Sequence, residues 1–248
     1  MTAALALSHR LKLATRTAHG RAERGPMMQR LLAGRLPLAD YCGLLRQFQA
    51  LYLALETGLA QHAGQAAMAR LCPAALWRSA ALADDLAHLL SLADRASAAA
   101  PAMAASTAIA PGAPASSTPA PAPGTAATLA PATLAYVARL QHLAQQAPLL
   151  LAAHAYVRYL GDLYGGQMLG RRLRLQHGLA EGPGTRFYEF GDAARVQALI
   201  GQFREALDAL VMTPDEADAL VAEACHAFER HEAIFEQLAP AAGPHPIQ

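Results

Sequence analysis

One short stretch of the sequence combines glycines and an aspartate in a way that indicates chemistry. The run YLGDLYGGQ contains Gly161, Asp162, Gly165 and Gly166 inside a segment that otherwise has the pattern of a helix. Each glycine in a helix interior costs roughly 1 kcal/mol relative to alanine, so their presence indicates that something approaches this backbone closely. The four-residue interval places Gly161 and Gly165 on one face, with Arg158 one turn earlier. This pattern predicts a flat ligand lying against bare backbone beside a carboxylate.

A second candidate for chemistry is the pair formed by His19 and Glu23, which stand one helical turn apart. A histidine that binds a metal through one ring nitrogen commonly donates its other N–H to a carboxylate, which fixes the tautomer. The same spacing is also common for ordinary surface pairs on helices. On this spacing alone, both interpretations remain open.

The segments that must position these residues have a helical period. The first helix carries Leu11, Ala14, Ala18 and Ala22 on one stripe, and a second carries apolar residues from Tyr41 to Leu55. Five further helices are predicted over residues 74–95, 132–147, 148–177, 192–212 and 214–238. The last has a clear start, because Thr213, Pro214 and Glu216 form a capping box with proline at the first helical position. Only residues 186–190 suggest an extended segment, so the predicted fold class is all-α.

An uncharged stretch interrupts this pattern. Residues 96–138 contain seven prolines and no charged residue, and alanine, serine, threonine and glycine make up most of the remainder. Such a composition cannot bury enough surface to offset the entropy of ordering, which predicts a disordered insert over residues 97–131. The amphipathic helices on either side need each other to bury their apolar stripes. We therefore expect residues 1–248 to form one domain, with a flexible tail at 239–248.

Composition excludes several classes of protein. The chain has 248 residues, 54% hydrophobic and 16% charged, and no apolar run long enough to span a membrane, so no membrane partner is expected. A net charge of +1 argues against a nucleic-acid partner. Three widely spaced cysteines, Cys42, Cys72 and Cys225, indicate neither a disulfide framework nor a zinc site. Without a recognisable secretion signal, the expected location is the cytoplasm.

Taken together, ATRTAHGRAE and the later AHAYVRYLGDLYGGQ resemble the heme oxygenase family. The resemblance extends to LYLALE, FREALDALVMTP and AFERHEAIFEQL, and so covers nearly the whole chain apart from the insert. It implies an all-helical bundle in which heme b, both substrate and cofactor, lies between the His19 helix and the glycine-rich helix. The implied reaction opens the ring at its alpha-meso carbon with O2 and yields biliverdin, carbon monoxide and ferrous iron.

The resemblance also implies roles for individual residues. It makes His19 the iron ligand and Glu23 its hydrogen-bonding partner. Asp162 becomes the distal catalytic carboxylate, which holds a water network that protonates bound dioxygen. The remaining assignments are supporting catalytic residues Tyr52 and Arg158, heme contacts at Gly161, Gly165 and Gly166, and propionate anchors Lys12, Arg16, Tyr156 and Arg204.

The implied partners are heme, O2 and an external electron donor, either ferredoxin, flavodoxin or a reductase, because the sequence has no flavin or nicotinamide motif. The expected oligomeric state is a monomer. A basic rim formed by Arg171, Arg172 and Arg174 would suit an acidic donor, or would simply be a solvated helix end.

Two residues depart from the family pattern, and two other functions remain as alternatives. Tyr164 stands where a small serine is usual, and His231 where an amide is common near the distal water network. A protein that stores or delivers heme without degrading it would need His19 and the propionate anchors, but not Asp162 in register with two glycines. A di-iron site would need further inward carboxylates and a second copy of the motif formed by Glu223 and His226, which the sequence lacks.

Overall fold

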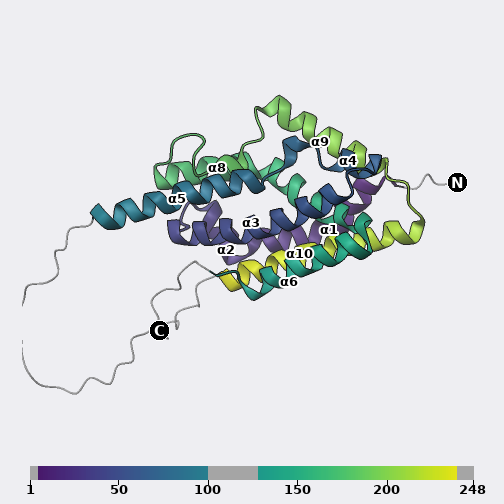
Figure 1. Ribbon diagram of the computed structural model, residues 1–248, viewed down its shortest axis with the longest axis horizontal. Coiled ribbons are helices and arrows are strands. Elements are labelled where there is room, and N and C mark those ends of the chain that lie inside the picture. Colours follow the sequence, from purple (N-terminus) through teal and green to yellow (C-terminus); the bar gives the residue numbers. More distant parts are fainter. Residues whose placement is uncertain (1–4, 100–127, 239–248) are drawn as a thin grey trace, which may run out of the picture.

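A computed structural model describes residues 5–99 and 128–238, and within them the regular structure is entirely helical (Figure 1). The predicted all-α class is confirmed. The helices are α1 (Leu7–Arg24), α2 (Pro26–Leu32), α3 (Leu38–Gln61), α4 (Ala66–Leu71), α5 (Ser79–Ala99), α6 (Pro131–Gln146), α7 (Leu151–Ala155), α8 (Gly161–His177), α9 (Ala193–Asp208) and α10 (Pro214–Leu238).

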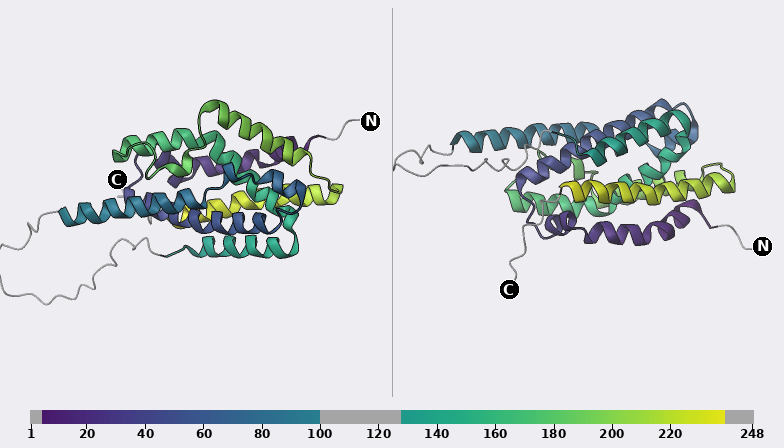
Figure 2. Two further views of the ribbon diagram at one scale, coloured as in Figure 1. Left: turned by 45° about the horizontal axis from the view of Figure 1, so that its top comes forward. Right: turned by 90° about the horizontal axis from the view of Figure 1, so that it is seen from below.

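Helix α3 forms the centre of the bundle. It packs along both α5 and α6, while α10 packs along α1 and also contacts α6 and α7 (Figure 2). The residues of α3 that face these neighbours recur every three or four positions and are almost fully buried, among them Leu44, Leu45, Phe48, Leu51, Tyr52, Leu55 and Leu59. Helices from before and after the uncharged insert therefore share one hydrophobic core.

Helix α8 runs beside α2 and α9, and both of these helices also contact α1. At one end of α1, Ser8 donates from its backbone N–H to the Asp208 carboxylate of α9 at 2.8 Å. At the middle of α1, the hydroxyls of Thr15 and Tyr156 are 3.3 Å apart. These contacts hold the first helix alongside the beginning of the glycine-rich helix.

Some predicted boundaries are confirmed and others are wrong. Helix α10 begins at Pro214 as predicted, and the capping box is present: the Thr213 N–H donates to Glu216 at 2.7 Å, and the Glu216 N–H donates to the Thr213 hydroxyl at 3.3 Å. The predicted extended segment at 186–190 is wrong, because Arg186–Tyr188 form a 3₁₀ turn. Short α2 and α4 were not predicted.

Two other predicted helices differ at their ends. The helix predicted from residue 74 starts only at Ser79, since Ala74–Leu76 form a 3₁₀ turn and the Glu56 carboxylate accepts the N–H groups of Arg78 and Ser79. Glu56 thus serves as the cap of α5 from another helix. The helix predicted over 192–212 ends at Asp208.

The prediction of a disordered insert over 97–131 is wrong at both of its ends. Residues 97–99 belong to α5, and α6 already begins at Pro131. Just before α6, the buried Gln47 side chain accepts the Ala130 N–H at 2.9 Å and donates to the Thr128 carbonyl at 3.4 Å. The remainder of the predicted insert and the predicted tail at 239–248 lie outside the described residues.

The predicted helix over 148–177 has an internal irregularity. It comprises a 3₁₀ turn at Pro148–Leu150, α7, a π-helical segment at Tyr156–Leu160, and then α8. A π turn inserts one extra residue and so changes which side chains share a face; such turns frequently occur at functional sites. In this chain it lies directly before Gly161 and includes Arg158.

Within residues 5–99 and 128–238, none of the helices is both long enough and apolar enough to cross a lipid bilayer.

Candidate active site

One face of α1 carries His19 together with charged side chains. Leu11, Thr15 and Ala18 point into the core, which leaves Lys12, Arg16, His19 and Glu23 on the outward side at helical spacing. The predicted histidine–carboxylate pair is present, with His19 Nδ1 3.6 Å from Glu23 Oε2 and 53% of the histidine side chain exposed. Glu23 approaches Nδ1, whereas no carboxylate in the described part of the chain lies within 4 Å of Nε2.

The His19 ring also has an aromatic neighbour on α10. The ring of Phe228 lies edge-on to it, with 5.8 Å between the ring centroids. This contact, together with Glu23, limits the rotation of the imidazole without burying it.

The three residues predicted to be catalytic form one hydrogen-bonded triangle at the junction of α3 and α8. The Tyr52 hydroxyl donates to Asp162 Oδ2, and Arg158 Nη2 donates to Asp162 Oδ1 at 2.8 Å. Arg158 Nε also donates to the Tyr52 hydroxyl at 3.0 Å. The structure thus places Tyr52 beside Arg158 and Asp162, which lie more than a hundred positions later in the sequence. No local pattern in the sequence predicted this contact.

Burial shifts the pKa of every member of this triangle. Burial raises the pKa of Asp162, although Arg158 and the hydrogen bond from Tyr52 oppose the shift. It also raises the pKa of the Tyr52 hydroxyl well above its usual value. Burial disfavours the charged Arg158 guanidinium, but the interactions with Asp162 and Tyr52 together outweigh burial and leave its pKa raised. The triangle therefore brings together the positive charge of Arg158, the Asp162 side chain and a hydroxyl that keeps its proton.

Two of the three glycines face unfilled space. A Cβ atom placed on Gly161 or on Gly165 would meet no atom within 4 Å. Both therefore expose backbone on the side of α8 where the sequence predicted a flat ligand, next to Asp162. A side chain at either position would project into that space.

Gly166 was predicted to contact the ligand, but it faces Tyr188 instead. It is buried, and a Cβ on it would lie 3.4 Å from the Tyr188 ring; at Gly170 the corresponding distance to the Tyr188 Cβ is 3.0 Å. Gly166 is rotated by about 100° from Gly165 around the helix axis, which accounts for the difference. Its role is to admit Tyr188 rather than to face the open space.

The predicted anchoring cations lie on two neighbouring helices. Lys12 and Arg16 stand on the outward face of α1, and Arg204 stands on α9, one turn before the Asp208 that binds Ser8. Across residues 5–99 and 128–238, no carboxylate lies within 4 Å of any of these three cations. Tyr156 joins this group through its contact with Thr15. The positive charge is thus available to an anionic ligand between α1 and α9.

Tyr164, the departure inside the glycine motif, lies on the outer side of α8. Its side chain is 56% exposed, and the Arg204 guanidinium lies over its ring at 5.6 Å. The tyrosine therefore borders the candidate site through a cation–π contact with one of the anchoring cations.

His231, the other departure, is buried among aromatic rings. It packs edge-on against Tyr136, with 5.1 Å between centroids, and also contacts Phe48. Both of its ring nitrogens are buried without a hydrogen-bond partner among the described residues. Burial, and then the charge of Arg158, lower its pKa well below the usual value, so the ring is neutral at pH 7.

A buried polar network beside the triangle was not predicted. The His154 ring links the Tyr136 hydroxyl, 2.8 Å from Nδ1, to Glu223, 3.0 Å from Nε2. Glu223 also accepts two hydrogen bonds from Arg139, at 2.6 and 3.1 Å. The available signal was His154 itself, since a histidine inside the apolar run LLLAAHAY must find polar partners when it is buried.

Replacing Glu223 with glutamine should destabilise the free protein by about 2 kcal/mol at pH 7, because the buried carboxylate loses its charge beside Arg139 and His154. Burial opposes ionisation of Glu223, but His154 and Arg139 outweigh it and lower its pKa to about 2. Because the pKa in the folded protein lies below the usual value of 4.5, this stabilisation is present above pH 4.5 and is lost as the pH falls toward 2.

Urea unfolding at a series of pH values measures this effect, with Glu236→Gln, an exposed change on the same helix, as the control. The wild-type protein should lose stability more steeply than Glu223→Gln below pH 4.5. Parallel pH profiles for the two proteins would contradict the assigned ion pair.

The di-iron alternative finds no support in the described part of the chain. His226 Nδ1 lies 4.0 Å from Glu223, but Arg139 and His154 already occupy that carboxylate. No cluster of three or more histidine, cysteine, aspartate or glutamate side chains there is arranged to hold a metal ion.

Comparisons with known proteins agree with the resemblance seen in the sequence. The family model described as heme oxygenase matches residues 5–122 and 124–237. The chain is 29% identical over 232 residues to heme oxygenase 1 of Nostoc sp., with 94% of this chain and 85% of that protein covered. To heme oxygenase 1 of Bos taurus it is 30% identical, with 94% and 71% covered.

A solved structure gives the same match in three dimensions. Heme oxygenase-1 of Synechocystis sp., determined in complex with heme, superimposes with a TM-score of 0.76 at 27% identity, covering 94% of this chain and 92% of that one.

Proposed function

This chain belongs to the heme oxygenase family and is a heme-degrading oxygenase, and from that premise we propose that it binds heme between α1 and α8 and cleaves it with the residues of these two helices. The products would be biliverdin, carbon monoxide and ferrous iron. The observation that carries the proposal is the surface of α8, where two bare glycines face open space beside the buried Asp162. A planar macrocycle can lie against such a surface, whereas a side chain would hold it away.

The residues on α1 fit the other side of the same ligand. His19 would bind the iron through Nε2, with Glu23 holding Nδ1 and thereby the tautomer. Heme supplies the iron at which dioxygen is reduced, and its own ring is the part that is oxidised. A neutral imidazole pushes less electron density onto the iron than a thiolate does, which suits attack on the ring.

On the α8 side, the proposed task of the triangle is to place a proton source near the reacting oxygen. Asp162 would orient a water molecule toward the ligand, while Tyr52 and Arg158 hold its carboxylate in one rotamer. Burial strengthens these interactions because little water competes for them. None of the three needs to touch iron to do this.

The anchoring cations would determine the in-plane orientation of heme. Its two propionates are carboxylates, and Lys12, Arg16 and Arg204 carry charge that is not already paired with a described carboxylate. Tyr156 can add a hydrogen bond from its hydroxyl. The ring carbon that lies next to Asp162, and hence the biliverdin isomer formed, would follow from this anchoring.

Replacing Lys12 with alanine should weaken heme binding about fivefold, because a partly exposed charge-assisted contact contributes about 1 kcal/mol. It should also release a mixture of biliverdin isomers, since heme could then bind in more than one orientation. Titration with hemin gives the first quantity, and chromatography of the products gives the second. Lys12→Arg, which keeps the charge, is the matched control. A single isomer from Lys12→Ala, with unchanged affinity, would remove Lys12 from the anchoring set.

Electrons would come from an external donor such as ferredoxin, flavodoxin or a reductase. Arg171 and Arg172 are exposed on α8 and form a basic surface suited to an acidic donor. Arg174 does not contribute in the same way, because it binds Thr185 and Glu189.

The deciding experiment is single-turnover spectroscopy with purified protein. Hemin is added, then oxygen and a source of electrons, and the absorbance of heme and biliverdin is followed. The proposal expects loss of the heme band and formation of biliverdin with release of carbon monoxide. A heme complex that remains intact would instead support the alternative of a non-degrading heme-binding protein.

A further inference from the structure

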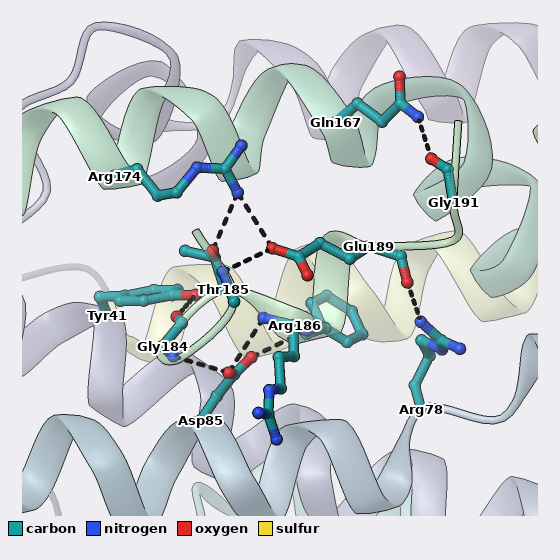
Figure 3. Close-up of polar contacts among 12 residues, drawn as sticks. Tyr41, Arg78, Asp85, Gln167, Arg174, Gly184, Thr185, Arg186, Glu189 and Gly191 are labelled. Atoms are coloured by element: carbon teal, nitrogen blue, oxygen red, sulfur yellow. Dashed lines mark hydrogen bonds and ion pairs between the residues drawn. The ribbon is translucent and has the colours of Figure 1, made fainter. Parts of the chain in front are cut away.

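The loop that follows α8 makes polar contacts with α3, with α5 and with α8 itself (Figure 3). We propose that this loop, residues 178–192, is a brace that fixes the position of α8 behind the heme face, and that Asp85 and Tyr188 are positioning residues for the reaction. The inference rests on the function proposed above for α8. We refer to residues 178–192 as the brace loop.

Asp85 of α5 is the main anchor of the brace loop. It is completely buried, and its carboxylate accepts three backbone N–H groups: those of Gly184 at 2.9 Å, Arg186 at 3.0 Å and Phe187 at 2.8 Å. Its neighbour Asp84 is exposed, and among the described residues its side chain binds that of Arg186 alone. A buried carboxylate that receives three backbone donors defines the path of the loop through these residues.

Two further contacts hold the brace loop from the same side. The Tyr41 hydroxyl of α3 donates to the Gly184 carbonyl at 2.9 Å, and Arg78 donates to the Glu189 carbonyl at 2.8 Å. Gly184 has a φ of +92°, and a Cβ there would lie 2.9 Å from Leu89 of α5. A side chain at Gly184 would therefore be strained by this backbone conformation and would collide with Leu89.

On its other side the brace loop holds α8. Arg174 donates to the Thr185 hydroxyl at 3.0 Å, and Gln167 donates to the Gly191 carbonyl at 3.1 Å. Between these two hydrogen bonds, Tyr188 packs against Gly166 and Gly170, whose missing side chains make room for it. The brace loop therefore supports the face of α8 that lies away from Gly161.

The brace loop also reaches the catalytic triangle from behind. Phe187 packs edge-on against the Tyr52 ring, with 5.4 Å between centroids, and the Tyr52 hydroxyl donates to Asp162. Phe187 also donates its backbone N–H to Asp85. One anchored turn thus supports both α8, which carries Asp162, and the tyrosine that orients its carboxylate.

Hydrogen exchange on the free protein tests the brace without relying on heme turnover. In Asp85→Asn, the amide replaces an oxygen that accepts a backbone N–H, and exchange of the α8 amides should become about tenfold faster, as expected for loss of one buried charge-assisted bond. Exchange in α6, which makes no side-chain hydrogen bond to the brace loop within the described residues, should stay at the wild-type rate. Asp84→Asn is the matched control and should leave both helices unchanged.

Two substitutions of Tyr188 leave the contacts of Asp85 in place, because Asp85 binds the loop only through backbone N–H groups of Gly184, Arg186 and Phe187. Tyr188→Ala should speed exchange in α8, whereas Tyr188→Phe, which keeps the ring, should not. With heme bound, Tyr188→Ala should lower the rate of biliverdin formation about tenfold while the heme dissociation constant changes less than threefold.

Two results would overturn the proposal. If exchange became faster only within residues 178–192, Asp85 would anchor the loop without positioning α8. If exchange increased equally in α6 and α8, the substitution would have lowered the stability of the whole protein. If wild-type protein forms no biliverdin, the proposed function fails, whereas the exchange experiment still decides whether the brace positions α8.

Discussion

Protein with His19 replaced by alanine is expected to bind heme without its axial nitrogen ligand and to lose at least a hundredfold in biliverdin formation. The imidazole is the only iron ligand proposed on α1, and His9, the other histidine of that helix, lies ten residues earlier, about 15 Å away along the helix axis. A hundredfold loss corresponds to about 2.7 kcal/mol. Spectroscopy of the heme complex and the single-turnover assay measure the two effects.

The structure makes this variant a clean test. Because 53% of the His19 side chain is exposed, its removal should leave the unfolding midpoint of the heme-free protein nearly unchanged. His9→Ala, an exposed change on the same helix, is the matched control for binding and turnover. Added imidazole should restore part of the His19→Ala activity by occupying the vacated position.

Glu23→Gln separates the ligand from its orienting partner. It keeps the imidazole but removes the carboxylate 3.6 Å from Nδ1, so a smaller loss of about tenfold in heme affinity or turnover is expected. If His19→Ala behaved like His9→Ala, the iron ligand would have to be sought elsewhere.

The second large effect is expected at Asp162. Asp162→Ala should retain heme, because the anchoring cations and His19 are untouched, yet form biliverdin at least a hundredfold more slowly. Without the carboxylate, nothing orients the proton source beside the Gly161 surface, and oxygen chemistry should be diverted to peroxidase-like oxidation of an added phenol. Product chromatography and a phenol-oxidation assay measure the two outcomes.

Asp162→Ala should also lower the folding stability of the protein. The Arg158 side chain is only 13% exposed and would lose its partner at 2.8 Å, which should cost about 2 kcal/mol of folding stability. Tyr52→Phe is the matched comparison, since it removes one hydrogen bond to Asp162 and leaves the ion pair intact; a loss of about tenfold is expected. Undiminished biliverdin yield from Asp162→Ala would refute the assigned role.

The regular helices could be predicted from the sequence because their signals are local. Apolar spacing identified α3, and the capping box of Thr213 and Glu216 gave the first residue of α10. The two candidate motifs are local as well: the glycines stand within a few residues of Asp162, and His19 stands four residues before Glu23. Such signals pointed to a flat ligand, and the family resemblance implied that this ligand is heme, with residues on both of its sides.

What each of these residues faces was decided only by the tertiary structure. Gly165 faces open space while the adjacent Gly166 faces Tyr188, because the two differ by about 100° around the helix and a distant loop occupies one of these directions. The 3₁₀ turn at Arg186–Tyr188 forms where Asp85 of another helix accepts its N–H groups, which local propensity cannot express. The sequence by itself determined which residues could do the chemistry; contacts between distant segments decided how they are held.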